Sequence, residues 1–171
     1  MKIILLGYMG SGKSTIGKAL ANELNLSFVD LDHAIEKQIG MSIRDYFEAS
    51  GELKFRRLEN EVLKKILNEN NDMILSTGGG TPCYGNNLDL MKMIFNAKVF
   101  YLKATIKTLT ERLVSEKGTR PLIQSIGDDD LLEFIGKHLF ERSNFYLQAH
   151  HVVDIDQKSV ETIVKEIVEL L

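Results

Sequence analysis

The sequence predicts an α/β fold in which helices cover both faces of a parallel sheet. Two observations favour this class: short apolar runs recur along the chain, and the segments between them have the periodicity of helices. The runs lie at residues 3–6, 28–29, 73–75, 99–102 and 152–155. Strands that alternate with helices pair in parallel, and ligands of such sheets gather at the carboxyl ends of the strands. Function is therefore sought in the residues that follow each run.

The composition is that of an ordinary globular chain. It has 171 residues, of which 44% are hydrophobic and 26% charged, and its net charge of −3 indicates no nucleic-acid partner. No apolar run is long enough to span a membrane, so we expect no membrane partner and a cytoplasmic protein. The single cysteine, Cys83, excludes an internal disulfide. Because no repeat or linker interrupts the chain, we expect residues 1–171 to form one domain.

The first apolar run leads into a phosphate-binding loop. Residues 7–14 fit the pattern G-x-x-x-x-G-K-[ST], and the helical segment after them completes the strand, loop and helix that this motif requires. Glycines let backbone N–H groups approach phosphate oxygens, and the helix N-terminus adds a partial positive charge. We expect a solvent-facing Lys13 to reach the β- and γ-phosphates, and Ser14 to bind Mg²⁺. The alternative, a chance pattern in a glycine-rich turn, does not account for the flanks. The predicted ATP-binding residues of this loop are Gly10, Ser11, Gly12, Lys13, Ser14 and Thr15.

The second run leads into two carboxylates. Asp30 and Asp32 are spaced i, i+2, and at the end of a strand they would point the same way. An acid beside Mg²⁺ and phosphate can hold the water ligands of the metal or accept a proton from an attacking hydroxyl. The alternative is that Asp32 only caps a helix that starts at His33.

A helix predicted for residues 51–70 carries two arginines. Its apolar stripe consists of Phe55, Leu58, Val62 and Ile66. With this stripe in the core, Arg57 faces solvent, while Arg56 lies on the flank with Glu59 one turn later. Arg56 then projects along the sheet edge towards a ligand, or it makes an ordinary surface ion pair with Glu59.

Glycines and polar residues follow in the second half of the chain. The glycines at residues 78–80 come directly after the third run and contribute no packing, which indicates that a ligand lies against bare backbone there, although a flexible turn is the alternative. Residues 111–130 are polar and are typical of a functional lid in which Arg120 reaches the phosphates, or of a solvated surface loop. Arg142 lies on a helix predicted for residues 131–146, and Ser159 caps a C-terminal helix.

Together these segments resemble the shikimate kinase family, small P-loop kinases with the nucleoside monophosphate kinase-like fold, over residues 2–171. The matching segments are the phosphate loop (7–17), the strand-end acids (28–32), the arginine helix (51–52 and 55–59), the glycine triplet (78–80), the lid motif (120–122), and Arg142 with Tyr146. The resemblance implies a three-layer P-loop NTPase fold, with a five-stranded parallel sheet in the order 2-3-1-4-5. It also implies substrate-binding helices at about residues 34–57 and a mobile lid at about residues 112–130.

The resemblance implies a role for each site residue. Lys13, Asp32 and Arg120 would be catalytic, with Arg120 also binding ATP. Asp32 would bind the ring hydroxyls of shikimate and either take the proton or only position the hydroxyl, while Asp30 would orient Mg²⁺ through water. Arg112 is the nearest candidate for a contact with adenine, but its spacing from Arg120 leaves that role open. The implied shikimate-binding residues are Asp32, Arg56, Gly79, Gly80 and Arg142, the two arginines gripping the carboxylate.

The reaction that follows from the resemblance is transfer of the γ-phosphoryl group of MgATP to the 3-hydroxyl of shikimate, in aromatic amino acid biosynthesis. Its products would be shikimate 3-phosphate and ADP, and we expect a monomer with ATP and shikimate as partners. Another small-metabolite kinase, such as a gluconate kinase, is the nearest alternative. A GTPase-type switch would need N-K-x-D and D-x-x-G motifs, which the sequence lacks. A transporter-type ATPase is disfavoured because residues 75–79, which are similar to its signature, follow a strand-like run and precede a proline.

Overall fold

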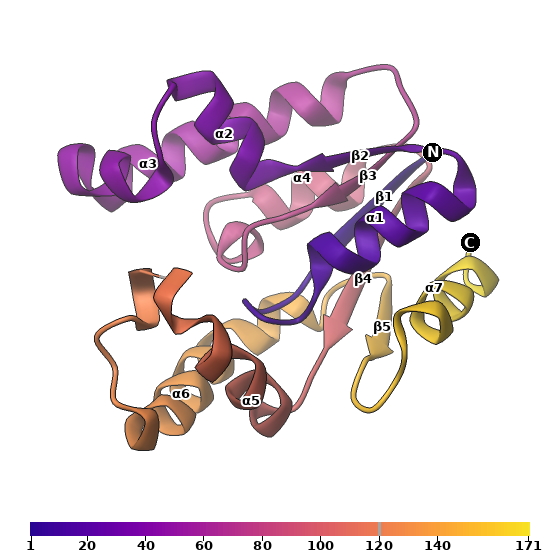
Figure 1. Ribbon diagram of the computed structural model, residues 1–171. Helices are drawn as coiled ribbons and strands as arrows, with labels where there is room; N and C mark the ends of the chain where they lie inside the picture. Colours follow the sequence, from indigo (N-terminus) through magenta and orange to yellow (C-terminus); the bar gives the residue numbers. More distant parts are fainter. Residues whose placement is uncertain (120) are drawn as a thin grey trace.

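A computed structural model of the protein describes residues 1–119 and 121–171 and contains a parallel sheet flanked by helices (Figure 1). Its strands are β1 (Lys2–Leu6), β2 (Ser27–Asp30), β3 (Met73–Ser76), β4 (Ala97–Lys103) and β5 (His151–Asp154). Their spatial order is β2-β3-β1-β4-β5, and every neighbouring pair is parallel. The five predicted apolar runs coincide with these strands, so the predicted sheet and its order are confirmed.

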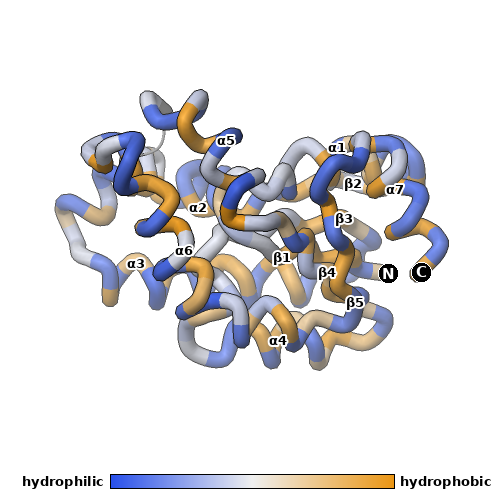
Figure 2. Tube along the Cα trace, turned by 90° about the horizontal axis from the view of Figure 1, so that it is seen from below, coloured by the Kyte–Doolittle hydropathy of each residue, from blue (hydrophilic) through white to orange (hydrophobic). Residues whose placement is uncertain are grey.

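Helices cover the sheet on both faces. They are α1 (Lys13–Leu24), α2 (Leu31–Ile39), α3 (Ile43–Asn68), α4 (Asn87–Met93), α5 (Ile106–Glu116), α6 (Asp128–Tyr146) and α7 (Val160–Glu169), with short 3₁₀ helices η1 (Thr81–Cys83), η2 (Lys117–Thr119) and η3 (Pro121–Ile123). α1 and α7 lie together on one side of the sheet and α4 lies on the other, which gives the predicted three layers (Figure 2). Among the described residues, no helix combines the length and apolarity that a bilayer-spanning segment needs.

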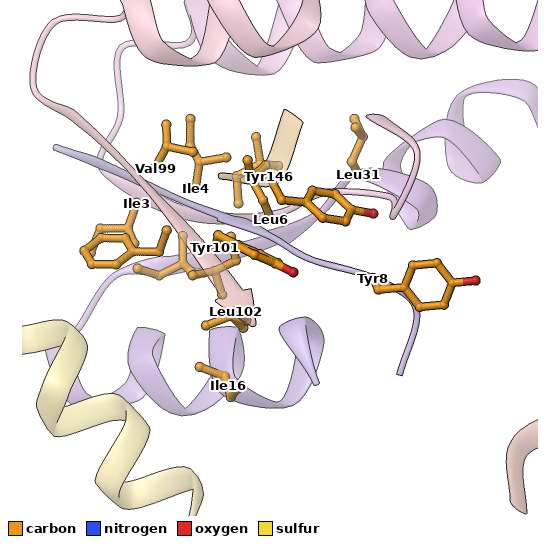
Figure 3. Packing of buried hydrophobic residues seen from close by; sticks show 14 of the residues in the cluster. Ile3, Ile4, Leu6, Tyr8, Ile16, Leu31, Val99, Tyr101, Leu102 and Tyr146 are labelled. Carbon is orange, nitrogen blue, oxygen red and sulfur yellow. The ribbon is translucent and has the colours of Figure 1, made fainter. Parts of the chain in front are cut away.

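The core lies between the central strands and these helices. Every residue of β1 and β3 is buried, as expected for inner strands of a parallel sheet with both faces covered. Figure 3 shows Ile4 and Leu6 near Tyr146 on one side of the sheet, and Ile16 of α1 below Leu102 on the other. This arrangement fixes the carboxyl ends of the strands, where the phosphate loop leaves β1.

Three predicted boundaries in the helical regions need correction. The helix predicted for residues 51–70 corresponds to the part of α3 that follows the break at Gly51, and it ends at Asn68 rather than at residue 70. The helix predicted for residues 131–146 begins at Asp128, because three aspartates in its first turn suit the positive end of the helix dipole. The predicted lid at residues 112–130 therefore overlaps the end of α5 and the first turn of α6, and the described residues between them include η2 and η3. Ser159 caps α7 as predicted, its Oγ accepting a hydrogen bond from the backbone N–H of Thr162.

A glycine divides α3 into two segments. Gly51 has φ 76° and ψ 167°, a non-helical conformation in the middle of the helix. The rings of Phe47 and Phe55 pack across this kink with their centroids 4.5 Å apart. The second segment starts after Gly51 and carries Arg56. The kink therefore sets the angle between the segment with Arg56 and the segment before Gly51.

We predict that Gly51→Asn lowers the free energy of unfolding by about 1–3 kcal/mol, because its φ and ψ are essentially restricted to glycine. Gly40→Asn is the matched control. Gly40 has φ 71° and ψ 17°, the left-handed helical conformation that Asn25 already adopts in this chain. A Cβ meets no atom within 4 Å at either glycine. Denaturant unfolding should therefore show a change below about 1 kcal/mol for Gly40→Asn. Equal losses in the two variants would contradict the prediction.

Candidate active site

A pocket of about 410 Å³ opens at the carboxyl ends of the strands, beside the loop between β1 and α1. All the predicted phosphate-loop residues line it, together with Asp30, Asp32 and Gly79. Gly10 and Gly12 have positive φ values of 78° and 84°, which turn the loop before α1 begins at Lys13. The structure thus brings the predicted loop and the strand-end acids to one cavity.

Lys13 does not face bulk solvent, contrary to our expectation. Only 9% of its surface is exposed, and its Nζ donates hydrogen bonds to the backbone oxygens of Gly7 (2.8 Å) and Tyr8 (3.0 Å). These carbonyls belong to the loop that Lys13 closes, so the ammonium group is drawn into the loop's interior. Its positive charge is consequently fixed by the backbone at the pocket.

The two aspartates have different local roles. Asp30 Oδ1 accepts hydrogen bonds from the backbone N–H groups of Asp32 (3.1 Å) and His33 (3.4 Å), which makes Asp30 the N-cap of α2. Its other oxygen, Oδ2, accepts a hydrogen bond from Ser14 Oγ at 2.8 Å. The alternative in which Asp32 is the helix cap is therefore wrong. The expected strand-end pair is also corrected, since Asp32 lies in the first turn of α2.

The environment of Asp32 favours its protonated form. Its side chain is accessible from the pocket, but protein on the other sides removes much of its hydration. This desolvation, followed by the neighbouring charge of Asp30, raises the pKa of Asp32 to about 6. Lys13 opposes the shift, and Glu59 adds to it. A carboxyl group with this pKa is a stronger base than an ordinary aspartate and is still mainly ionised at neutral pH.

The glycines at residues 78–80 make room for the side chains of the site. A Cβ at Gly78 would lie 2.8 Å from Asp32 Oδ1, and one at Gly80 would lie 2.9 Å from Arg56 Nη2. At Gly79 it would lie 3.3 Å from the backbone nitrogen of Met9 in the phosphate loop. The sequence predicted bare backbone here for the sake of a ligand. The structure shows that the protein's own acid, arginine and loop also need the space.

The acid that pairs with Arg56 one turn later is buried, so its pair with Glu59 is not the surface ion pair of the alternative. Glu59 is 1% exposed, and its two oxygens accept hydrogen bonds from Arg56 Nη1 (2.9 Å) and Thr81 Oγ1 (2.7 Å). Thr81 follows the glycine triplet, so Glu59 ties the arginine of α3 to the end of β3. Arg57 is exposed, as its place on the helix predicted. Glu59 and Thr81 were not predicted as site residues, because their roles depend on contacts between distant segments.

Arg142 reaches the same region from α6. A Cβ at Gly79 would lie 3.7 Å from its Nη1, and its Cζ lies 6.0 Å from the centroid of the Tyr8 ring. Tyr146, one turn later, donates a hydrogen bond from its hydroxyl to the Gly79 oxygen at 2.5 Å and stacks on Tyr101, with their ring centroids 5.0 Å apart. The pairing of Arg142 and Tyr146 in the sequence thus joins α6 to the glycine triplet.

The far side of the pocket was less well predicted. Arg112 Nη1 donates a hydrogen bond to the Gly10 oxygen at 3.2 Å, and Arg112 lines the pocket with Ile155, Lys158 and Ile163. The last three residues come after β5. Because ligands gather at the carboxyl ends of parallel strands, the sequence could have indicated them as site residues. Arg120, a predicted catalytic and ATP-binding residue, lies outside the described residues.

A glycine loop that presents a lysine, next to the carboxylates of Asp30 and Asp32, is the site of a P-loop enzyme of phosphoryl transfer. The shikimate kinase family model matches residues 9–171 of the chain. A shikimate kinase of Flavobacterium johnsoniae is 45% identical over 170 residues, which are 99% of this chain and 98% of that protein. The chain belongs to the shikimate kinase family.

Solved structures agree with this assignment. The 1.7 Å crystal structure of shikimate kinase from Bacteroides thetaiotaomicron has a TM-score of 0.92 and 37% identity, and the match covers 99% of this chain and 97% of that one. Shikimate kinase from Acinetobacter baumannii, solved in complex with shikimate, has a TM-score of 0.87 and 32% identity, with coverages of 99% and 91%. The fold and family predicted from the sequence are therefore confirmed.

The raised pKa of Asp32 has a consequence for stability. The folded state holds this proton more tightly than the unfolded state, so the stability that Asp32 contributes falls as the pH rises from about 4 through about 6. We predict that Asp32→Asn raises the melting temperature of the unliganded protein at pH 8 by roughly 2–5 °C, after allowing for solvent screening of this accessible group. Near pH 4 the gain should disappear. Melting curves of both proteins across this pH range provide the measurement, and a pH-independent difference would contradict it.

Proposed function

We propose that this protein transfers the γ-phosphoryl group of ATP to the 3-hydroxyl of shikimate, giving shikimate 3-phosphate and ADP in aromatic amino acid biosynthesis. The observation that carries the proposal is the convergence of Arg56, Arg142 and Asp32 on the glycine triplet beside the phosphate loop. Two guanidinium groups suit a carboxylate, and an acid suits the hydroxyls of a ring. Family membership and the relative solved with shikimate support this choice of substrate.

The nucleotide would lie along the 410 Å³ pocket. Its phosphates would meet the loop residues Gly10, Ser11, Gly12, Lys13, Ser14 and Thr15, with the lysine charge directed to the β- and γ-phosphates. Arg112 and the segment after β5 line the other end of the pocket and would hold the adenine. Arg120 would reach the phosphates from the lid as it closes.

The residues at the mouth of the phosphate loop fit Mg²⁺. Ser14 Oγ and Asp30 Oδ2 lie 2.8 Å apart, and oxygen ligands of this kind suit a hard cation that also keeps water and phosphate ligands. Ser14 would bind the metal directly and Asp30 through water. Bound there, Mg²⁺ would neutralise charge on the phosphates. Among the described residues, no group of three or more His, Cys, Asp and Glu side chains could form a metal site by itself.

At the substrate end, Arg56 and Arg142 would bind the carboxylate of shikimate, while Gly79 and Gly80 let the ring approach the backbone. Asp32 would hold the ring hydroxyls and accept the proton of the 3-hydroxyl as the oxygen attacks phosphorus. The pKa of about 6 fits this role, since the group is ionised at neutral pH yet basic enough to take the proton. Lys13 and Arg120 would oppose the negative charge on the phosphoryl group during transfer.

We further propose that residues 1–171 act as one domain and as a monomer in the cytoplasm. One hydrophobic cluster includes residues from β1, β3, β4 and β5, together with all the helices from α1 to α7, which supports a single domain. The net charge of −3 gives no support to nucleic-acid binding.

Release of ADP tests the function directly. We expect it to require both shikimate and Mg²⁺, because the acceptor site is built for a carboxylate with neighbouring hydroxyls. A coupled assay with ATP should give only background with no acceptor, with a nucleoside monophosphate or with gluconate. Equal turnover of gluconate would instead support the related sugar-acid kinase.

Variants of three arginines test the substrate site. Arg56→Lys and Arg142→Ala should raise the KM for shikimate by about 30- to 150-fold, the equivalent of roughly 2–3 kcal/mol for a lost charge-assisted hydrogen bond. Lysine keeps the charge of Arg56 but not its planar fork. Exposed Arg57, changed to Ala, is the control and should leave steady-state kinetics within about twofold of the wild-type values. A large effect of Arg57→Ala with a normal Arg56→Lys would refute the assignment.

A further inference from the structure

A second cavity, of about 610 Å³, is lined by Arg56 together with Glu52, Tyr84 and Asn60 among others. Tyr84 follows η1, the short helix after the glycine triplet. The Arg56 Cζ lies 3.9 Å from the centroid of the Tyr84 ring, much nearer than to the ring of Phe55 at 5.2 Å. Tyr84 is thus the aromatic ring that bounds the guanidinium most closely.

The hydroxyl of Tyr84 acts on a second neighbour of the arginine. It donates a hydrogen bond to Glu52 Oε1 at 2.7 Å, and the same oxygen accepts from Arg56 Nε (3.3 Å) and Nη2 (3.4 Å). Glu52 is 54% exposed, and an ion pair that exposed adds little order by itself. The hydrogen bond from Tyr84 restricts the movement of the Glu52 side chain, because it holds the carboxylate between the phenol and the guanidinium group.

Arg56 is therefore oriented from two edges and one face. Glu52 lies on its Nε edge, buried Glu59 binds Nη1, and the Tyr84 ring lies against the guanidinium. Each Nη nitrogen carries two N–H groups, so both can still donate to a carboxylate. Binding by a planar fork depends on its orientation, so a fixed plane reduces the entropy lost when the ligand binds.

We propose that Tyr84 is a positioning residue, which sets the plane of Arg56 through its ring and the place of Glu52 through its hydroxyl. This inference rests on the proposed function, in which Arg56 binds the shikimate carboxylate. It does not require Tyr84 to touch the substrate. Tyr84 is only half-buried, so its replacement should leave the core intact.

Steady-state kinetics of Tyr84→Leu and Tyr84→Phe test the proposal. Losing the ring should raise the KM for shikimate by roughly 5- to 30-fold. Tyr84→Phe keeps the ring and loses only the hydrogen bond to Glu52, so we expect a rise of about 2- to 5-fold. The kcat and the KM for ATP should stay within about twofold, since the contact is equal in the ground and transition states. Phe95→Leu removes an exposed ring from the turn between α4 and β4 and should match the wild type.

A double-mutant cycle separates positioning from general packing. In an Arg56→Ala background, Tyr84→Leu should change kcat/KM for shikimate by less than about twofold, while in an Arg142→Ala background it should keep its full effect. Initial slopes give kcat/KM even without saturation. A normal KM in Tyr84→Leu, or an equal loss in both backgrounds, would overturn the positioning role. Absence of shikimate turnover by the wild-type protein would instead overturn the proposed function, and this inference with it.

Discussion

The absence of side chains at residues 78–80 is the constraint on which the site depends. Asp32 comes from α2, Arg56 from α3 and Arg142 from α6, and all three approach this one stretch of backbone. A methyl group at Gly78 or Gly80 would occupy the space of a charged group, with predicted separations below 3 Å. The sheet brings the three helices to one edge, but the glycines decide how near their side chains come. The bare backbone of the triplet therefore determines the geometry of the site as much as its side chains do.

Such close packing of charges is a burden for the fold. Asp32 and Glu59 are neighbouring acids of like charge, and Glu59 is almost fully buried. Glu59 is stabilised by hydrogen bonds from Arg56 and Thr81. The hydrogen bond to Glu59 in turn fixes the position of the Arg56 guanidinium group. Burial of these charges lowers the stability of the fold, and the large apolar core around the central strands offsets this loss.

The sequence predicted the strands and the phosphate loop well, because both depend on local patterns. These patterns are apolar runs, the spacing of glycines and a lysine before a serine, and each involves residues that are close together in the sequence. The errors concern interactions between separate segments. The burial of Lys13 depends on two carbonyls of the loop, and the capping role of Asp30 on where the α2 helix begins. The helix predicted from Gly51 onward is present, but the sequence pattern did not show that Gly51 joins it at an angle to a helical segment before it.

The two oxygens of Asp30 divide their work between structure and chemistry. Oδ1 caps α2, the helix that carries Asp32, while Oδ2 faces Ser14 in the pocket. Under the proposed function, the partner of Oδ2 would change in each catalytic cycle while Oδ1 keeps the cap in place. Asp32, which we propose holds the acceptor, would then keep its position while nucleotide binds and leaves, although it lies only two residues after Asp30. One carboxylate would therefore make a contact that changes through Oδ2 and keep a constant helix cap through Oδ1.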